Sequence, residues 1–566
     1  MQGFCRIVTA LALVLRAPAW AQGVWETRAS YPIEATEVSA AAINGKVYAL
    51  CGLTLSGSAN SLFIYDPFTD VWRRGAPIPI AGGADHCNVA AAGGKLYLLG
   101  GLGSLSESPE TYEYDPVADR WQVVGRMPTP RGASGVTAIG SKIYVAGGLA
   151  NGRSVATFEA FDTVTREWTR LPNMPTARDH LTAQAADGKF YALAGRVGNP
   201  LPANEEYDPA TNTWRRRAPL PTPRGGLGSG TLAGRIQVFG GEGPSGTPQG
   251  TYRQNEEYDP ATDTWRTLRS MPTPRHGLYG ATVILPGSQG CIFTPSGGPV
   301  AGLNVSSVHE AFYLPPDEPP SIEPGGVRNA ASLAATLSPG ALVSLFGRRL
   351  SPLEQAASRF PLPTQLSTVI VKADGTPLAL LYVGPGQVNF HLPYDLAPGP
   401  LNLTVTNAGV ESAPSAVTTL AASPGIFALS QSGQGQGAIL IVGTSLVAGA
   451  VPGIPSRLVR KDEVVEIYCT GLGRLSGTAP LPGPGQPAPS SPLLRTIQTP
   501  IVTIGGARAE VLFSGLAPGL VGVYQINARI PNGAIAELRA PVTLRMGENE
   551  PPSNTVTVGI AGTVVP

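Results

Sequence analysis

Tyr258-Asp259-Pro260-Ala261-Thr262-Asp263-Thr264-Trp265 repeats almost unchanged the stretch Tyr207-Asp208-Pro209-Ala210-Thr211-Asn212-Thr213-Trp214. In both, an aromatic residue stands seven residues before a tryptophan. The tryptophans after residue 21 are Trp25, Trp72, Trp121, Trp168, Trp214 and Trp265. Their spacing of about 50 residues is typical of chains built from repeated β units around a ring.

The rest of each repeat is as regular as its tryptophan. An apolar run ends in a small-residue doublet such as Gly147-Gly148, and a Met/Leu-Pro-Thr-x-Arg phrase such as Met174–Arg178 follows the tryptophan. Four short strands joined by turns are therefore predicted per repeat, which is one propeller blade. Over residues 24–314 the pattern resembles the kelch family, and that resemblance implies binding more often than catalysis.

The last repeat lacks its tryptophan. Seven residues after Phe312 stands Pro319, whereas Trp25 belongs to an outer strand with no blade in front of it. We therefore predict a six-bladed propeller in which residues 24–30 supply the missing outer strand. Closing the ring in this way removes exposed sheet edges.

A different duplication occupies the C-terminal half. Beyond the proline-rich boundary at 315–320 tryptophan disappears, and Gln387–Phe390 ahead of Pro393 recurs as Gln525–Ala528 ahead of Pro531. Two immunoglobulin-like β-sandwich modules are predicted. The whole chain is then all-β, and its expected divisions are a leader at 1–21, the propeller at 22–316 and the sandwiches at 317–427 and 428–566.

Six motifs of this half resemble one C-terminal domain family, found on many secreted proteins of soil acidobacteria. They are Asn329–Ser332, Leu337–Gly340, Leu381–Phe390, Ser423–Phe427, Thr470–Gly473 and Gly522–Asn527. The resemblance covers about residues 325–560. Because the family has no known activity, it implies bacterial origin and export but no chemistry.

The first 21 residues have the three parts of a secretory signal peptide. Arg6 precedes the apolar run Ile7–Leu15, and Ala19-Trp20-Ala21 is a small-x-small cleavage site. No later apolar run approaches the ~20 residues of a membrane span. We expect a protein without a membrane span that is secreted, or held in the periplasm or cell envelope.

Composition excludes a nucleic-acid binder. Charged residues are 14% of the chain, and 40 basic against 39 acidic residues give a net charge of +1. Such a balance does not attract a polyanion. The 70 glycines and 56 prolines suit a turn-rich β protein, which we expect to be monomeric.

Four cysteines follow the leader: Cys51, Cys87, Cys291 and Cys469. Buried free thiols are the favoured interpretation, since cysteine is often buried in cores. A Cys51–Cys87 bridge between neighbouring blades is the one pairing that the repeat suggests. No metal-binding spacing of cysteine and histidine occurs, so neither a metal nor a cofactor is predicted.

The two faces of the propeller differ in their connections. The face that carries the links between blades, and between the second and third strand of each blade, has long loops such as 196–204 and 242–255. We call it the loop face. The opposite face has tight hairpin turns such as Asn44-Gly45. Function is expected on the loop face, because binding residues concentrate on loops.

Polar residues gather where the innermost strand of each blade begins. The candidate ligand-binding residues are Glu37, Asp85, His86, Arg131, Arg178, Asp179, His180, Arg224, Arg275 and His276. In one interpretation the arginines brace the loops and the Asp-His pairs cap turns. In the other, the arginines act as planar forks for an anionic or sugar ligand. His86, His180 and His276 would then converge on the axis from three sides, and Glu37 aligns one residue beyond the blade-one counterpart of Arg131.

No nucleophile or metal motif accompanies these residues, which favours a non-catalytic recognition protein. Its propeller would bind an extracellular glycan or protein, and the sandwiches would act as spacers or envelope-docking modules. Two enzymatic alternatives stay open. Galactose oxidases join a kelch propeller to an immunoglobulin-like domain, but their copper needs a cysteine-linked tyrosine that this sequence does not suggest. A kelch-type sugar epimerase would use a glutamate or arginine pair at the mouth, such as Glu37.

Overall fold

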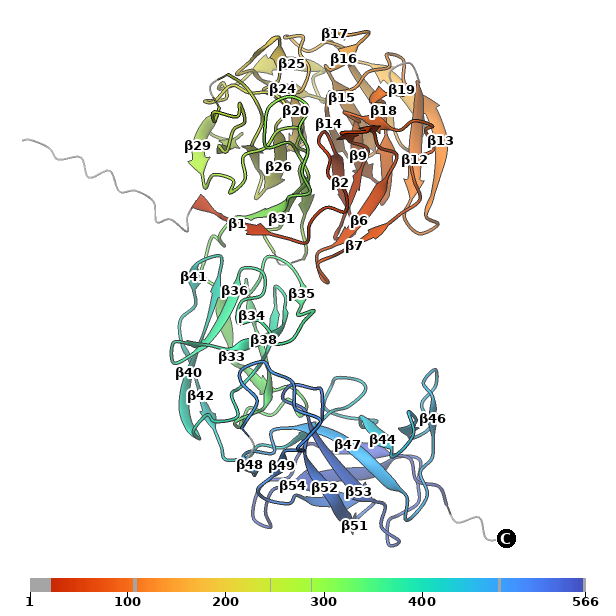
Figure 1. Cartoon of the computed structure of the whole chain (residues 1–566), viewed down its shortest axis with the longest axis vertical. Coiled ribbons are helices and arrows are strands. Elements are labelled where there is room, and N and C mark those ends of the chain that lie inside the picture. Colours follow the sequence, from red (N-terminus) through yellow and green to blue (C-terminus); the bar gives the residue numbers. More distant parts are fainter. Residues whose placement is uncertain (1–21, 105–108, 245, 287, 477–479, 563–566) are drawn as a thin grey trace, which may run out of the picture.

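The computed structural model describes residues 22–104, 109–244, 246–286, 288–476 and 480–562. The predicted leader, residues 1–21, lies outside the described residues. Every named element is a β-strand. Figure 1 shows an elongated molecule with a propeller at one end and two further β modules in a row beyond it. Within the described part of the chain, no helix has the length and apolar character to cross a bilayer.

The described strands of the propeller form six four-stranded antiparallel sheets. We number them as blades 1 to 6 and give the strands of each from the innermost outward. Blade 1 has β2 (Ser39–Ile43), β3 (Lys46–Leu50), β6 (Leu62–Asp66) and β7 (Val71–Arg74), blade 2 has β9 (Val89–Ala92), β10 (Lys95–Leu98), β12 (Glu110–Asp115) and β13 (Arg120–Arg126), and blade 3 has β14 (Gly135–Ile139), β15 (Lys142–Ala146), β18 (Phe158–Asp162) and β19 (Glu167–Arg170). Blade 4 has β20 (Thr182–Ala186), β21 (Lys189–Leu193), β24 (Asn204–Asp208) and β25 (Thr213–Arg216), blade 5 has β26 (Gly228–Leu232), β27 (Arg235–Phe239), β28 (Asn255–Asp259) and β29 (Thr264–Leu268), and blade 6 has β30 (Ala281–Val283), β31 (Cys291–Pro295), β32 (His309–Tyr313) and β1 (Val24–Thr27). The innermost strands contact one another in sequence, β2 to β9, β14, β20, β26, β30 and back to β2. The sheets therefore surround a common axis.

The N-terminal strand is the outer strand of the last blade. β1 pairs antiparallel with β32, with Trp25 opposite Phe312 and Val24 opposite Tyr313. This is the pairing expected from the tryptophan missing after Phe312. The two ends of the propeller segment thus share one sheet, in which β1 covers the edge that β32 would otherwise expose.

Each repeat tryptophan joins its blade to the preceding one. The indole Nε1–H donates to Arg269 O from Trp25, Ala29 O from Trp72, Ala76 O from Trp121, Thr111 Oγ1 from Trp168, Pro172 O from Trp214 and Ala218 O from Trp265. In blades 1 to 5 the tryptophan ring packs beside the aromatic seven positions earlier, as for Trp265 and Tyr258 at 5.0 Å. Trp25 packs instead beside Phe312 of the neighbouring strand, also at 5.0 Å. A buried indole needs a partner for its N–H, so the repeat signal in the sequence is also the contact between blades.

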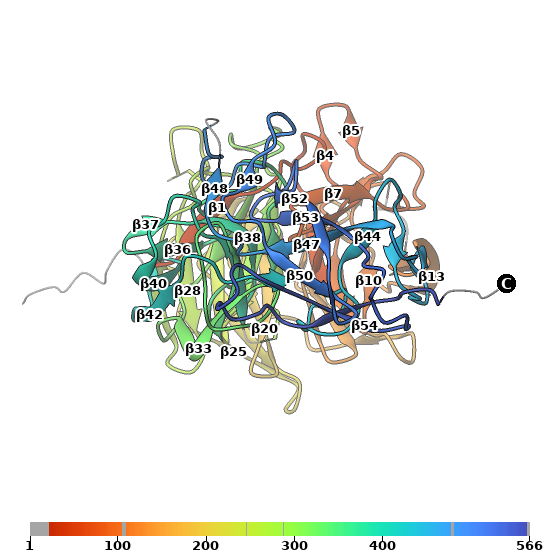
Figure 2. The same cartoon turned by 90° about the horizontal axis from the view of Figure 1, so that it is seen from below.

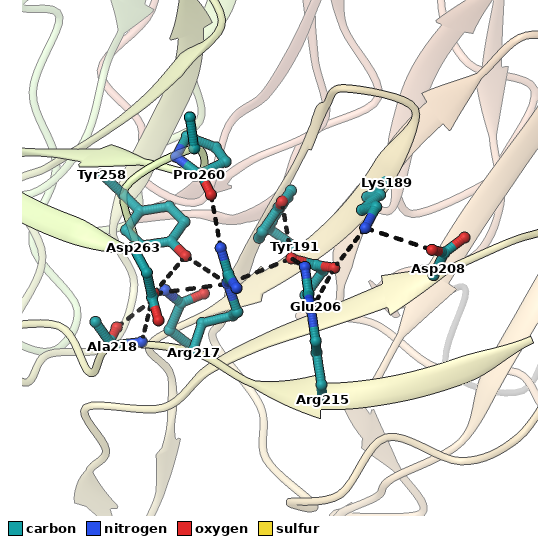
Figure 3. A network of polar contacts seen from close by, with 12 residues as sticks. Lys189, Tyr191, Glu206, Asp208, Arg215, Arg217, Ala218, Tyr258, Pro260 and Asp263 are labelled. Carbon is teal, nitrogen blue, oxygen red and sulfur yellow. Dashed lines mark hydrogen bonds and ion pairs between the residues drawn. The ribbon is translucent and has the colours of Figure 1, made fainter. Parts of the chain in front are cut away.

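Charged side chains add a second connection between blades 4 and 5, seen in Figure 3. Glu206 is 1% exposed and accepts hydrogen bonds from Arg215, Lys189 and Tyr191. Arg217 of blade 4 donates to Tyr258 Oη at 2.8 Å and to Pro260 O at 2.6 Å in blade 5. Burial works to raise the pKa of Glu206, but its three donors outweigh burial and lower it.

Short two-stranded pairs extend the loop face. Three of them are hairpins: β4 (Leu53–Thr54) with β5 (Gly57–Ser58), β16 (Leu149–Ala150) with β17 (Arg153–Ser154), and β22 (Arg196–Val197) with β23 (Asn199–Pro200). In the fourth, β8 (Ala84–Asp85) before β9 pairs with β11 (Leu102–Gly103) after β10. In the view along the long axis, the hairpin of β4 and β5 stands clear of the C-terminal modules (Figure 2).

Cys51 and Cys87 form a disulfide between blades 1 and 2, while Cys291 and Cys469 are free and buried. The pairing suggested by the repeat is therefore confirmed. The interpretation of all four as free thiols is wrong for the first two, because the loop face brings the end of β3 beside the start of β9.

The C-terminal half consists of two modules of two sheets each. The first has the sheet β33 (Ser321–Asn329), β34 (Leu342–Arg348), β39 (Gln387–His391), β38 (Ala379–Val383), β35 (Gln355–Ala356), and the sheet β37 (Thr376–Pro377), β36 (Val369–Ala373), β40 (Gly399–Asn407), β41 (Val410–Glu411) with β42 (Ser415–Thr419). The second has β46 (Ser456–Arg457), β45 (Val447–Ala448), β44 (Ile439–Ile441), β47 (Val464–Thr470), β53 (Tyr524–Arg529), β52 (Glu510–Leu516), β49 (Arg495–Thr496), β48 (Leu475–Ser476) with β43 (Gly425–Ile426), and β51 (Ala507–Arg508), β50 (Ile501–Ile504), β54 (Ala540–Arg545), β55 (Val556–Val558). The immunoglobulin-like topology stays a prediction.

The duplication predicted between these modules has a structural counterpart. β34 pairs with β39, and β47 pairs with β53. In both modules the glutamine donates to the asparagine two residues on, Gln387 to Asn389 and Gln525 to Asn527, each at 2.8 Å. The predicted boundary at 427/428 is slightly late, because β43 already pairs with β47 of the second module.

Candidate functional site

One residue per blade forms a ring at the start of the innermost strands. The residues are Glu37, His86, Ala133, His180, Gly226 and Gly277, all with φ between 49° and 64°. Backbone N–H groups link them from blade to blade: Ala133 to His86 O, His180 to Ala133 O, Gly226 to His180 O, Gly277 to Gly226 O and Glu37 to Gly277 O, at 2.8–3.1 Å. This left-handed conformation is uncommon outside glycine and costs of order 1 kcal/mol. The ring of hydrogen bonds holds it in place.

Three of these side chains meet, and we call Glu37, His86 and His180 the axial trio. Glu37 Oε2 lies 3.5 Å from His86 Nε2. The imidazole rings of His86 and His180 are 5.0 Å apart, edge to face. Blades 1, 2 and 4 thus contribute to one cluster, whereas blades 3, 5 and 6 place alanine or glycine at the same position.

The same three-residue relay orients both histidines. His86 Nδ1 is 2.6 Å from Asp85 Oδ1, and the other oxygen of Asp85 accepts a hydrogen bond from Ser58. His180 Nδ1 is 2.5 Å from Asp179 Oδ1, and Ser154 donates to that aspartate in the same way.

These contacts shift the pKa values of His86 and Asp85. Burial works to lower the pKa of His86, but the carboxylates of Glu37 and Asp85 outweigh it and raise the pKa. The pKa of Asp85 is lowered, since hydrogen bonds from His86 and Ser58 outweigh burial. A carboxylate–imidazole pair of this kind fixes which ring nitrogen carries the proton.

Two further charged residues border the trio. Arg196 Nη2 lies 3.0 Å from His180 Nε2, and Arg196 also pairs with Glu242. Glu242 Oε2 accepts the N–H of Gly302 at 3.1 Å and is 3.7 Å from His276 Nε2. Sequence analysis missed both residues, although Arg196 directly follows the doublet Ala194-Gly195 of blade 4. Their position after the doublet was the only local signal.

His276 does not join the trio, which corrects the predicted three-sided convergence. The blade-6 residue equivalent to His180 is Gly277, so His276 stands one residue before the ring and corresponds to Asp179 of blade 4. Its Nδ1 bonds to Gly298 O at 2.9 Å, and its side chain is 3% exposed. Glu37 was also misaligned: it lies two residues beyond Ala35, the blade-one counterpart of Arg131.

The four repeat arginines are not ligand forks. Their buried ion pairs are Arg131–Glu159, Arg178–Glu205, Arg224–Glu256 and Arg275–Glu310, with every arginine side chain 0% exposed. Each guanidinium also bonds backbone carbonyls, as Arg178 does with Ala192 O, Ala194 O and Thr176 O. Burial lowers the pKa of all four, against the effect of the paired glutamates. The bracing interpretation is correct, and the ligand-binding one is wrong because no ligand can reach these groups.

The glutamates of these pairs were predictable in principle. Each stands two residues before the repeat aromatic, as Glu205 does before Tyr207. Blades 1 and 2 lack both partners, with Ala35 and Phe63 in the first. Blades 3 to 6 have both the arginine and the glutamate, and blades 1 and 2 have neither. Such joint presence and absence indicates that the two side chains contact each other.

A polar groove lies on the loop face, at blade 1 and its link to blade 2. It has a volume of 430 Å³, and its lining includes Thr54, Ser56, Ser58, Asn60 and Arg74. Ser58 both lines the groove and donates to Asp85, the carboxylate behind His86. Groove and trio are thus connected through one hydroxyl.

Comparison with known proteins identifies the repeat. The family model of the KLHDC2/KLHL20/DRC7 kelch-repeats domain matches residues 86–298. The Kelch-like protein terF of Aspergillus terreus is 33% identical over 91 residues, which are 15% of this chain and 18% of that protein. This chain therefore matches less than a fifth of the relative's length. A solved structure described as "Structure of YjhT" is similar with a TM-score of 0.43 and 18% identity, over 50% of this chain and 95% of that one.

The family match begins at His86, in the ring position of blade 2, and ends at Gly298, which bonds His276 in blade 6. It thus includes His86 and His180 of the axial trio. The kelch-repeat match covers residues 86–298, and Glu37 lies outside it, on the same β-propeller.

Proposed function

We propose that the chain is an exported recognition protein whose loop face binds a carbohydrate. The observation that carries the proposal is the 430 Å³ groove lined by hydroxyl and amide groups. Sugar hydroxyls both donate and accept hydrogen bonds, as do the side chains of Ser56 and Asn60. Binding sites combine such a concave shape with a few placed polar groups.

Charged groups of the loop face support a ligand with an acidic substituent. Arg196 is 30% exposed, in contrast to the repeat arginines, so its guanidinium can reach a ligand at the mouth. A guanidinium binds a carboxylate with two parallel hydrogen bonds. Within the groove, Arg74 offers the same contact to the carboxylate of an acidic sugar. We also propose that the propeller has six blades and that the chain is a monomer. The C-terminal modules would act as spacers or envelope-docking units.

A glycan array probed with residues 22–566 tests the proposal. Asn60→Ala should weaken binding of any glycan found at least tenfold, because Asn60 lines the groove. Gln249→Ala, which changes another exposed loop amide outside the groove lining, is the matched control and should bind as the wild type. Equal binding by both variants, or binding to a protein array alone, contradicts a carbohydrate groove.

An epimerase acting on sugars is the second candidate. The contact between Glu37 and the His86–Asp85 pair offers an acid and a base within 3.5 Å of each other, as proton transfer at a sugar carbon or oxygen requires. Exchange of sugar anomers or epimers, followed by NMR with wild type and Glu37→Gln, distinguishes turnover from binding. The copper-oxidase alternative is weaker, because Cys87, next to His86, is already bonded to Cys51.

A further inference from the structure

The axial trio brings together the donor atoms of a metal site. One ligand atom from each of Glu37, His86 and His180 lies within 4.8 Å of the other two. Zinc forms bonds of about 2.0–2.1 Å to histidine and carboxylate, so tetrahedral donors stand about 3.4 Å apart. The 3.5 Å between Glu37 Oε2 and His86 Nε2 already fits that separation.

Both histidines are held as metal ligands usually are. Each Nδ1 is bonded to a carboxylate, Asp85 for His86 and Asp179 for His180. When Nδ1 carries the proton, the lone pair is on Nε2, which lies 3.5 Å from Glu37 Oε2 in His86 and 3.0 Å from Arg196 Nη2 in His180. Carboxylates of this kind orient metal-bound imidazoles and increase their basicity.

The charges around the trio leave room for a cation. Glu37 is 6% exposed, and among the described residues its carboxylate has one ion-pair partner, His86 Nε2 at 3.5 Å. Asp85, Asp179 and Glu242 are also at most 9% exposed. In the part of the chain that the structure describes, the one arginine or lysine that pairs with these carboxylates is Arg196, with Asp179 and Glu242. Buried carboxylates are costly unless paired or bound to metal.

Arg196 competes for one of the ligands. Its Nη2 lies 3.0 Å from His180 Nε2, the atom that a metal ion would need. Because Arg196 also pairs with Glu242, its guanidinium can keep that partner after leaving His180. The site therefore holds either the Arg196 contact or a metal at His180.

We propose that Glu37, His86 and His180 form a three-ligand site for zinc, which displaces Arg196 from His180. Three protein ligands leave a fourth tetrahedral position for water or for an anionic ligand group. The proposal departs from the sequence-based expectation of no metal. It goes beyond the recognition function and does not depend on any carbohydrate.

The test is zinc titration of tag-free residues 22–566, stripped with chelator and followed by calorimetry and elemental analysis. One zinc per chain is expected. His180→Ala and Glu37→Gln should each weaken zinc binding by about 100-fold or more, and Asp179→Asn by about 10–100-fold, the range found for residues behind a ligand. Arg196→Gln should bind zinc more tightly than the wild type.

The matched control is His276→Gln, since His276 borders the cluster without supplying a ligand to the trio. It should bind zinc as the wild type does. Cobalt(II) substitution adds a readout that folding alone does not produce, the visible absorption of a tetrahedral centre. Should His180→Ala unfold, the tightening expected of Arg196→Gln still decides the matter.

Two results would overturn the site: a wild-type chain that binds no zinc, or a folded His180→Ala variant with unchanged affinity. Repeating the glycan array in chelator separates this inference from the proposed function. Glycan binding without zinc binding refutes the metal site alone, and zinc binding without glycan binding refutes the carbohydrate proposal alone.

Discussion

Replacing one repeat arginine should lower the melting temperature of the propeller more than a substitution in an exposed loop does. Arg178 and Glu205 have side chains 0% and 2% exposed and lie 2.5 Å apart. In Arg178→Ala the glutamate stays buried with Thr176 as its remaining side-chain partner. Breaking a buried ion pair from one side costs about 3–5 kcal/mol. At about 2 °C per kcal/mol for a domain of this size, the melting temperature should fall by about 6–10 °C.

Tryptophan fluorescence measures this transition in the intact chain, because every tryptophan after the leader lies in the propeller segment. The chain also contains its own control. Blade 1 has Ala35 and Phe63 at the two positions, so the double variant Arg178→Ala/Glu205→Phe imitates a natural pair. It should recover more than half of the loss, since no charge is left buried.

A single variant that melts within about a degree of the wild type would refute the argument, because Glu205 would then be hydrated or protonated at little cost. A double variant less stable than the single one would also count against it. In that case packing around the guanidinium, and not the uncompensated charge, would dominate.

Three further predictions concern other parts of the chain. Deleting residues 22–32 removes β1 and the Trp25 contact, exposes β32 and should lower the fluorescence melt by several degrees; an unchanged melt would mean that another strand closes the ring. Cys87→Ser should cost about 2–4 kcal/mol, the usual value for a disulfide, and the wild type in reductant should melt like the variant; a wild-type melt insensitive to reductant would contradict the bridge. Burial lowers the pKa of His391 to about 4, whereas the unfolded chain takes up that proton near 6.5. The contribution of neutral His391 to the free energy of unfolding is therefore fully present above pH 6.5 and should fall by about 3 kcal/mol toward pH 4. In calorimetry of the C-terminal modules, His391→Leu should flatten this pH dependence. An unaltered slope would exclude His391 as its source.

The propeller could be predicted from local pattern because its contacts repeat with the sequence. Each of these tryptophans bonds the preceding blade, and in blades 1 to 5 it packs on the aromatic seven residues before it. The orphan Trp25 and the missing tryptophan after Phe312 together pointed to one strand pair, which the structure contains. The sequence pattern was sufficient here because the same contact between neighbouring blades recurs in every repeat.

Burial of the repeat arginines was decided by tertiary structure. In the sequence, Arg178 next to Asp179 and His180 looks like part of a polar loop. In the fold, its side chain turns inward to Glu205 while the backbone continues toward the axis. Neighbouring residues of one loop thus have different partners, Glu205 for Arg178 and the axial cluster for His180, and only the three-dimensional path of the chain separates them.

The sequence by itself determined the repeat, the closing strand and the loop face, because these follow from spacing along the chain. It did not determine which polar residues meet. His86 and His180 come together and His276 does not, since hydrogen bonds around the ring align His180 with Gly277 and leave His276 one residue behind. Arg196 and Glu242 enter the same cluster from loops whose lengths differ between blades. Side-chain convergence at an axis depends on the closed ring and its backbone angles, and no local pattern records either.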